Sequence, residues 1–415
     1  MHGINKKNGE LHLDDISLSD LAVSFGTPSY VYSASQIRNN FLDYKNSMRT
    51  EDKVCFAVKS NSNINILKFL NGLGSGFDVV SGNELRRCLV AGADPKNIVF
   101  SGVGKTAEEI ELALEEGIFS INIESESELE RIIQISKKIG KIANCAIRVN
   151  PDISAESHPY ITTGLKSSKF GVTSKVAIIM SRRIQESESV NLIGLACHIG
   201  SQITKSKLIL DSLDHLIDLA NEINKESKSI SFLDIGGGLG ITYKDEEAAN
   251  AKEIMTGVLD KIKELDFNLV VEPGRSIVGN AGVLLSRVEY LKETDASNFA
   301  IVDAGMNDLM RPSLYSAWHD ISAVKDLETP EKTYEIVGPV CESADSLAKD
   351  RVLKIKEGSV IVIHDVGAYG NVMASNYNTR LRPPEIMIDG SDIHQIKRRE
   401  TFEELISLED TSDEN

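Results

Sequence analysis

Short apolar runs alternate with amphipathic segments of helical period between about residues 53 and 280. The apolar runs lie at 54–58, 77–80, 98–100, 120–123, 145–149, 192–197, 232–235 and 269–271. Segments such as 83–91, 107–116, 126–139 and 208–224 have the period of helices. Eight strand–helix units are the number that closes a parallel barrel of about 250 residues. We therefore expect an α/β fold with a (β/α)8 TIM-like barrel. A doubly wound open sheet is the alternative, because periodicity alone cannot show closure.

The pattern changes after about residue 280. Strand-like runs at 283–291, 299–302, 334–337 and 359–363 follow one another with few long helices, which predicts a second, mostly β domain. The N-terminal segment, with a strand-like run at 28–32, is expected to join it. The predicted domains are therefore 1–35 with 281–415, and the barrel at 36–280. The tail at 400–415 carries seven acidic residues and no basic one, and we expect it to fray.

Charge and cysteine content exclude several classes of function. The 415 residues carry a formal charge of -17, which disfavours nucleic acid or an anionic membrane surface as partner. No apolar run approaches 18 residues, and no apolar stretch follows the first lysines. The five cysteines are far apart and lack metal-ligand spacing, so we expect no metal site, free thiols and a cytoplasmic protein.

Polar residues recur where the predicted strands end. They are Lys59, Asp78, Arg148, His198, the glycines Gly236, Gly237 and Gly238, and Glu272. Barrel enzymes place their chemistry on this rim, so these residues are expected to share one site. Three successive glycines let the backbone approach an anion, which predicts a phosphate site. The loop at 102–106 resembles the end of a P-loop, but Val99 stands where a glycine is needed, and we interpret it as a plain connection.

A rim lysine, a phosphate site, a flat histidine and a carboxylate together suggest pyridoxal 5'-phosphate. This cofactor needs a lysine for its covalent link and a partner for its ring nitrogen. Glu272 would keep that nitrogen protonated, which suits loss of carbon dioxide from an amino acid. His319 and His364 are interpreted as structural or solvated residues.

Nine motifs together resemble one enzyme family. They are FAVKSN (56–61), GFDVVSGNEL (76–85), HPYITTGLKSSKFG (158–171), HIGSQ (198–202), DIGGGLG (234–240), EPGRSIVGNAG (272–282), DAGMNDLMRPSLY (303–315), VGPVCESAD (337–345) and GAYGNVMASNYN (367–378). The chain resembles the meso-diaminopimelate decarboxylases, in the alanine-racemase-like (fold-type III) group of pyridoxal-phosphate enzymes. The resemblance runs from about residue 28 to 385.

The resemblance implies a role for each matching residue. Lys59 matches the Schiff-base lysine, and Cys341 the second catalytic residue. The cofactor contacts would be Lys59, Asp78, Arg148, His198, Ser201, Gly236, Gly237, Gly238, Glu272, Pro273, Gly274, Arg275 and Tyr369. The substrate contacts would be Arg275, Arg311, Tyr315, Glu342 and Tyr369. Cys341 and Glu342 match residues that the partner subunit supplies, which implies a homodimer with shared active sites.

The implied function is pyridoxal-phosphate-dependent decarboxylation of meso-2,6-diaminopimelate to L-lysine and CO2, the last step of lysine biosynthesis. A related decarboxylase of a polyamine precursor, carboxynorspermidine or ornithine, is the alternative. The ornithine branch should lack an arginine for a distal carboxylate, a role that Arg311 would fill in this chain. A non-catalytic homologue should lack Lys59 or Cys341, and both are present. A racemase remains a third option, against which the pair Cys341–Glu342 counts.

Overall fold

The computed structural model describes residues 3–151 and 169–410, and the chain divides into two compact units. Unit 1 comprises Met1–Ile37, Tyr243–Asp245 and Val278–Asn415. Unit 2 comprises Arg38–Thr242 and Glu246–Ile277. The boundaries that the sequence suggests for independently folding domains, at residues 35 and 280, stay a prediction.

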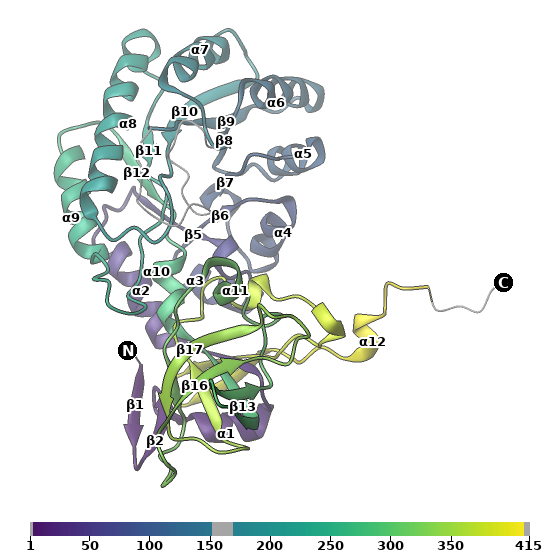
Figure 1. The fold of residues 1–415 in the computed structure, drawn as a ribbon. Coiled ribbons are helices and arrows are strands. Elements are labelled where there is room, and N and C mark those ends of the chain that lie inside the picture. Colours follow the sequence, from purple (N-terminus) through teal and green to yellow (C-terminus); the bar gives the residue numbers. More distant parts are fainter. Residues whose placement is uncertain (1–2, 152–168, 411–415) are drawn as a thin grey trace. The chain divides into compact units, whose positions relative to one another are not determined.

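Unit 2 is a closed barrel of eight parallel strands (Figure 1). Its order is β10-β11-β12-β5-β6-β7-β8-β9, and β12 pairs with β5 to close it. The expected barrel is thus confirmed, and the open doubly wound sheet is wrong. The strands are β5 (Lys53–Ala57), β6 (Gly76–Val79), β7 (Ile98–Phe100), β8 (Ser120–Ile123), β9 (Ala143–Arg148), β10 (Val190–Ala196), β11 (Phe232–Asp234) and β12 (Asn268–Val271).

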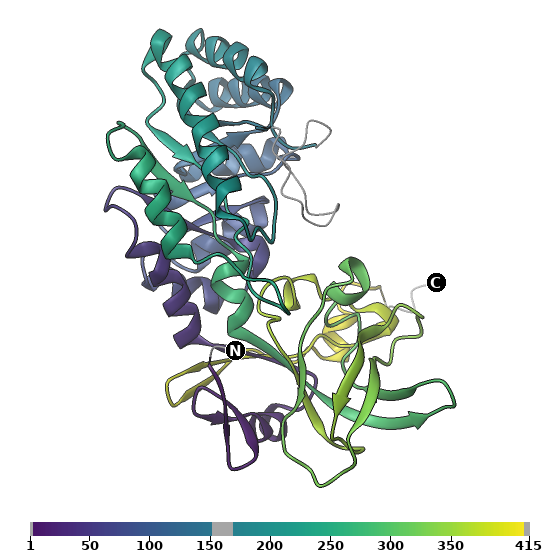
Figure 2. The same cartoon turned by 60° about the vertical axis from the view of Figure 1, so that its left-hand side comes forward.

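Helices surround these strands (Figures 1 and 2). They are α3 (Ile64–Gly72), α4 (Gly82–Val90), α5 (Ala107–Glu116), α6 (Glu126–Ile139), α7 (Ser174–Gln185), α8 (Ser206–Ser227) and α9 (Ala251–Ile262), with α2 (Ala34–Lys45) and α10 (Arg275–Val278) at the boundaries of the unit. Local sequence sets their ends. The Thr106 side chain accepts a hydrogen bond from the Glu109 amide and Glu109 returns one, so α5 starts with a capping box. It ends at Gly117, which is left-handed.

The barrel interior changes from apolar to polar along the strands. Four side chains from alternate strands, Cys55, Val99, Ala146 and Phe232, pack in one cluster with Val270. Residues two positions further along a strand point to the same side. In three of these strands that position holds a polar residue, namely Ser101, Arg148 and Asp234. The apolar cluster therefore lies below a polar end, where the strands finish.

Unit 1 is mostly β, as expected. A nine-stranded sheet runs in the order β17-β16-β14-β13-β4-β19-β20, with β15 and β18 off this path, and β1-β2-β3 form a small sheet. The strands are β1 (Ile4–Lys7), β2 (Glu10–Leu13), β3 (Ile16–Ser17), β4 (Ser29–Ser33), β13 (Gly282–Glu293), β14 (Asn298–Val302), β15 (Ile321–Ala323), β16 (Lys332–Val337), β17 (Ser346–Leu353), β18 (Val360–Ile363), β19 (Glu385–Asp389) and β20 (Asp392–Lys397). The N-terminal strand β4 lies between β13 and β19, so both ends of the chain build this sheet.

Three short helices complete unit 1: α1 (Leu18–Phe25), α11 (Arg311–Tyr315) and α12 (Phe402–Leu405). Helix α12 lies in the tail for which the sequence predicts fraying. Thr401 and Glu404 form a capping box there, and Arg398 forms an ion pair with Glu404. These local bonds give the tail one helical turn as far as Leu405.

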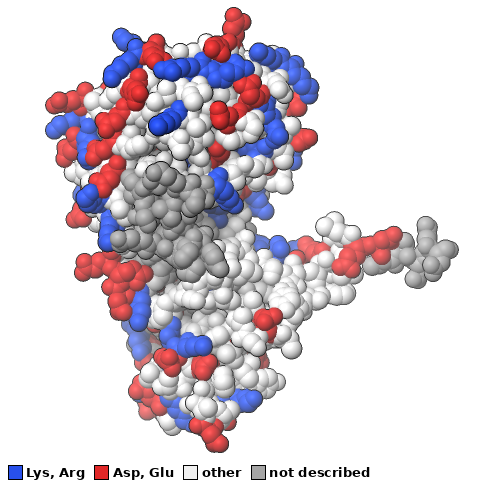
Figure 3. Space-filling view, turned by 45° about the horizontal axis from the view of Figure 1, so that its top comes forward, with Lys and Arg blue, Asp and Glu red and all other residues white. Residues whose placement is uncertain are grey.

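The molecular surface mixes charges of both signs. On the face shown in Figure 3, acidic and basic side chains are interspersed rather than separated by sign. The described residues on this face therefore form no extended basic surface of the kind that binds nucleic-acid backbones. Within residues 3–151 and 169–410, no helix has both the length and the apolar character needed to span a bilayer.

The packing of Phe232 gives a first prediction. A Cβ atom on Gly194 of β10 would lie 2.3 Å from a ring carbon of Phe232, so Gly194→Ala should overpack the barrel. We expect urea denaturation to show a loss of about 1–3 kcal/mol in the free energy of unfolding. Gly72→Ala is the control, because a Cβ atom there would meet no atom within 4 Å. Equal stabilities for the two variants would contradict the described packing.

Candidate active site

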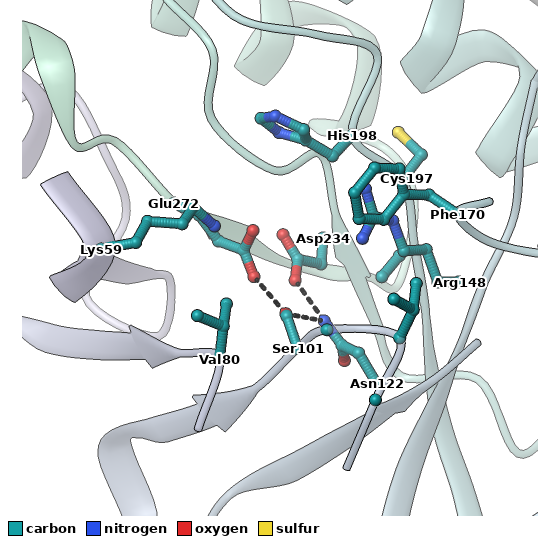
Figure 4. A pocket seen from close by; sticks show the side chains of 14 residues that line it. Lys59, Val80, Ser101, Asn122, Arg148, Phe170, Cys197, His198, Asp234 and Glu272 are labelled. Carbon is teal, nitrogen blue, oxygen red and sulfur yellow. Dashed lines mark hydrogen bonds between the residues drawn. The ribbon is translucent and has the colours of Figure 1, made fainter. Parts of the chain in front are cut away.

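A cavity of about 390 Å³ opens at the polar end of the barrel. Its volume is in the range of small-molecule sites. The polar side chains that line it are Lys59, Ser101, Asn122, Arg148, His198, Asp234 and Glu272 (Figure 4). They come from seven of the eight strands or from the segments that directly follow them. Lys59, Arg148, His198 and Glu272 thus lie around one cavity, at the end of the barrel where the sequence predicts a shared site.

Lys59 forms an ion pair with a buried carboxylate. It lies in a 3-10 turn (Val58–Ser60) directly after β5, and its Nζ is 2.7 Å from Oδ2 of Asp78. The Asp78 side chain is fully buried on β6, and its other oxygen, Oδ1, has no hydrogen-bond partner among the described residues. Asp78 therefore holds the amine at the cavity wall.

Glu272 and Asp234 belong to one buried hydrogen-bond network (Figure 4). Ser101 Oγ donates to Glu272 Oε1 at 3.3 Å. Asn122 Nδ2 donates to Ser101 Oγ at 3.1 Å and to Asp234 Oδ2 at 3.2 Å. The two carboxyl groups also share a direct hydrogen bond. Side chains of β7, β8 and β11 thus fix the position of the Glu272 carboxyl group.

Burial makes both of these carboxyl groups hard to ionise. It raises the pKa of Glu272 well above its usual range, and repulsion by Asp234 and then Asp78 adds to the effect. Burial likewise raises the pKa of Asp234 to about 6, although its hydrogen bond with Glu272 opposes this. A cation placed beside Glu272 would reverse the preference of that group for its neutral form.

His198 presents a neutral ring to the same cavity. Burial lowers the pKa of His198 well below its usual range, and the charges of Arg148 and Lys59 lower it further. The Gly237 amide donates to Nδ1 of His198 at 3.2 Å, so Nδ1 is the unprotonated ring nitrogen. Arg148 pairs with Glu124 at 2.7 Å. A flat, uncharged ring of this kind suits stacking on a planar ligand.

The glycine run follows β11 with its backbone packed against neighbouring strands. The Gly236 amide donates to Asp234 Oδ1 at 2.9 Å, and the Gly236 carbonyl accepts from the Glu272 amide at 2.7 Å. A Cβ atom on Gly237 would lie 2.0 Å from Glu272 O, and one on Gly238 would lie 2.1 Å from Gly200 O. These positions therefore exclude side chains, and the loop presents backbone.

The residues that follow β12 lie next to the glycine run. Pro273 O accepts from the Ala57 amide at 3.0 Å, and a Cβ atom on Gly274 would lie 2.9 Å from Ser60 Oγ. Arg275 begins α10 and donates from Nη2 to Ser201 Oγ at 3.0 Å. The structure thus brings Ser201 and Arg275 together, and it packs Pro273 and Gly274 against the segment that carries Lys59.

The remaining predicted site residues belong to unit 1. They are Arg311 and Tyr315 on α11, the exposed residues Cys341 and Glu342, and Tyr369, whose backbone is left-handed with φ +57°. The Cys341 amide donates to Asn378 Oδ1 at 2.8 Å, and Tyr377 OH donates to Glu342 Oε2 at 3.3 Å. Their roles toward substrate stay predictions. Most of the motif at 158–171 lies outside the described residues.

The residues of the cavity fit pyridoxal phosphate. The amine of Lys59 would carry the cofactor, the glycine run, where no side chain fits, leaves room for its phosphate, and Glu272 suits its ring nitrogen. Among residues 3–151 and 169–410, nothing donates a hydrogen bond to Oδ1 of Asp78, which is buried beside that amine. In residues 3–151 and 169–410, no group of three or more His, Cys, Asp or Glu side chains is arranged to hold a metal ion.

The sequence pattern does not reveal several cavity residues. Ser101, Asn122 and Asp234 are absent from the predicted site, and the loop at 102–106, interpreted as a plain connection, lines the cavity through Gly102 and Gly104. Two of these three residues could have been identified, because residues two positions apart on a strand face the same side. Ser101 and Asp234 stand two residues after the core residues Val99 and Phe232.

The chain is similar to known decarboxylases. The family model for "Pyridoxal-dependent decarboxylase, pyridoxal binding domain" matches residues 34–279. The diaminopimelate decarboxylase of Pseudomonas aeruginosa is 46% identical over 99% of both chains, and that of Vibrio cholerae is 44% identical over 97% of both.

Solved structures show similarity to the same enzymes. The diaminopimelate decarboxylase of M. jannaschii has a TM-score of 0.94 and 38% identity, over 99% of this chain and 98% of that one. The enzyme of Helicobacter pylori, complexed with L-lysine, has a TM-score of 0.91 and 41% identity, over 94% of this chain and 98% of that one. The resemblance inferred from the motifs is thereby confirmed. The chain belongs to the pyridoxal-dependent decarboxylases and, within them, to the diaminopimelate decarboxylase family.

Proposed function

We propose that this chain decarboxylates meso-2,6-diaminopimelate to L-lysine and carbon dioxide with pyridoxal phosphate as cofactor, the last step of lysine biosynthesis. One observation carries the proposal: a single cavity joins the amine of Lys59 to the acid network of Glu272. The relatives that match nearly the whole chain bear the name of this activity. A relative of known structure was solved with L-lysine.

The chain's own residues would hold the cofactor. When bound, pyridoxal phosphate supplies a ring that accepts the electron pair left on the reacting carbon when carbon dioxide departs. Lys59 provides the amine for the covalent link, and Asp78 orients that amine. Glu272 holds a negative charge against the ring nitrogen, and His198 packs on the ring face. The glycine run with Arg275 binds the phosphate.

Residues of unit 1 would act on the substrate. Arg311 binds the carboxylate that is kept, with Arg275, Tyr315 and Tyr369 as further contacts, and Glu342 suits the distal amine. Cys341 would supply the proton that replaces carbon dioxide, because a positioned thiol can act as a general acid. Ornithine has no distal carboxylate and offers nothing to Arg311, so this branch fits less well than diaminopimelate.

The same proposal includes a cytoplasmic homodimer with shared active sites. Lys59 and Glu272 lie in unit 2, whereas Cys341 and Glu342 lie in unit 1 and are exposed. Exposed polar residues with proposed catalytic roles are the ones a second subunit can use. All five cysteines are free thiols, as suits a reducing compartment.

Removal of the Lys59 amine should abolish the covalent link. Borohydride treatment of the loaded protein should add the phosphopyridoxyl group to the Lys59 peptide, as measured by mass spectrometry. Lys59→Ala should show no such addition, and its decarboxylase activity should fall to background. Lys53→Ala, at the other end of the same strand, is the control and should still be labelled. A labelled Lys59→Ala protein would overturn the assignment.

The raised carboxyl pKa values predict a pH dependence of stability. A buried acid whose pKa is raised binds more protons folded than unfolded, so the free energy of unfolding falls as pH rises. For Asp234, the rise from 3.8 to about 6 corresponds to a loss of roughly 2–3 kcal/mol between pH 4 and pH 7. We therefore expect urea denaturation of the cofactor-free protein to show lower stability at pH 7 than at pH 5.

The variant Glu272→Gln tests the origin of this effect. It removes one acid whose pKa is raised in the folded protein, so the fall in stability with pH should be smaller than in the wild type. Glu253→Gln changes an exposed acid on α9 and is the control. If Glu272→Gln leaves the slope unchanged, the carboxyl pair is not its cause.

Mixing two inactive variants tests the shared site. Lys59→Ala damages the barrel half of the site, and Cys341→Ala damages the other half. Random reassembly makes about half of the dimers mixed, each with one intact site of two. Activity should therefore recover to roughly a quarter of the wild-type value. If subunit exchange is proven and no activity returns, each chain builds its own site.

A further inference from the structure

A buried cluster in unit 1 surrounds the guanidinium group of Arg311. Arg311 is only 6% exposed, and His319 is fully buried. Arg311 Nη1 lies 2.7 Å from Nε2 of His319. The Arg311 guanidinium also lies over the ring of Tyr243, 4.6 Å from its centre. The Tyr243 and His319 rings meet edge to face, with centres 5.4 Å apart. The rings of His319 and Tyr243 therefore both contact the guanidinium cation of Arg311.

These contacts determine the tautomer of His319. A guanidinium group has only donors, so Nε2 of His319 must accept and cannot carry a proton. The proton of the neutral ring is then on Nδ1, which donates to the backbone oxygen of His364 at 2.8 Å. Arg351 Nη2 donates to the His319 carbonyl at 3.0 Å and holds its backbone. His319 thus orients Arg311 through a ring that is itself fixed at both nitrogens.

Both rings orient the guanidinium and bring no negative charge to it themselves. A neutral imidazole and a phenol ring carry no negative charge, so neither contact cancels the charge of Arg311. An arginine that is oriented in advance loses less side-chain freedom when it binds a carboxylate. The cluster therefore holds the guanidinium in one orientation, which suits a group that binds a carboxylate.

We propose that His319 is a positioning residue for Arg311, and that with Tyr243 it gives the enzyme its selectivity for substrates with a carboxylate at the end away from the reacting carbon. The proposal rests on the proposed function, in which Arg311 binds that carboxylate. His319 touches neither the cofactor nor the reacting atoms in this scheme.

Two ligands distinguish this role from a general effect on the fold. The product L-lysine keeps the distal carboxylate of diaminopimelate. Because the substrate has meso configuration, the centre that reacts is the one of D configuration. D-lysine therefore presents the reacting centre without a distal carboxylate. A residue that acts through Arg311 should matter for diaminopimelate and L-lysine and should not matter for D-lysine.

The test compares His319→Leu, which removes the acceptor, with His319→Gln, which can keep an acceptor near the position of Nε2. In holoenzyme, His319→Leu should raise KM for diaminopimelate about tenfold and weaken L-lysine binding in calorimetry about tenfold. Its kcat should stay within about twofold, and its binding of D-lysine in calorimetry should match that of the wild type. His319→Gln should restore most of the loss.

A double-variant cycle provides the readout that a structural role would not produce. If His319 acts through Arg311, adding His319→Leu to Arg311→Ala should cause no further loss of L-lysine affinity. Tyr243→Leu should weaken L-lysine binding, and Tyr243→Phe, which keeps the ring face, is its matched control. If His319→Leu does not fold, His319→Gln and the two Tyr243 variants still test whether the two rings act through Arg311.

The outcomes separate the two levels of the proposal. Additive losses in the cycle, or equal losses for diaminopimelate and D-lysine, overturn the role of His319. If Arg311→Ala binds L-lysine as tightly as the wild type, the substrate role of Arg311 fails and the proposal with it. If the wild-type holoenzyme does not decarboxylate diaminopimelate, the proposed function fails, whatever the variants do.

Discussion

The burial of Asp78, Asp234 and Glu272 around one cavity is the constraint on which the site depends. Three carboxyl groups in a space of low polarity are costly unless cations or hydrogen bonds balance them. Lys59 balances Asp78, and Ser101 with Asn122 holds the other two. The apolar cluster below them supplies rigidity, since it keeps the strand ends at fixed distances. The barrel thus holds Glu272 where the ring nitrogen of the proposed cofactor would add a positive charge.

Much of this architecture could be predicted from the sequence, and the failures have physical reasons. Each of the eight barrel strands is buried on both faces, so each appears as an apolar run. In unit 1, strand β20 was missed because its residues are exposed or half-buried and its sequence, DIHQIK, shows no sustained alternation. Helix α11 was missed because it has five residues, fewer than a period can reveal.

The site also contains residues that the sequence reveals and residues that it does not. Lys59 and Glu272 stand out because charged residues are rare at the ends of apolar runs. Ser101 and Asn122 do not stand out, since small polar residues are common there and their value depends on partners that only folding brings together. For His319, the sequence pattern indicates a structural or solvated residue. The fold buries the ring, as expected of a structural residue, but only the fold shows that its partner is Arg311. Pairing across a fold is not encoded in the local pattern.

The position of strand β4 has a consequence for how the chain is made. This strand leaves the ribosome first among those of the large sheet, yet its two neighbours, β13 and β19, are translated only after the whole barrel. About 250 residues therefore separate the appearance of β4 from that of its first partner. During that interval Tyr30 and Tyr32, which the finished sheet buries, lack their cover. The barrel can fold on the ribosome before the strands of unit 1 have all been made. The order of synthesis therefore favours earlier folding of the unit that carries Lys59.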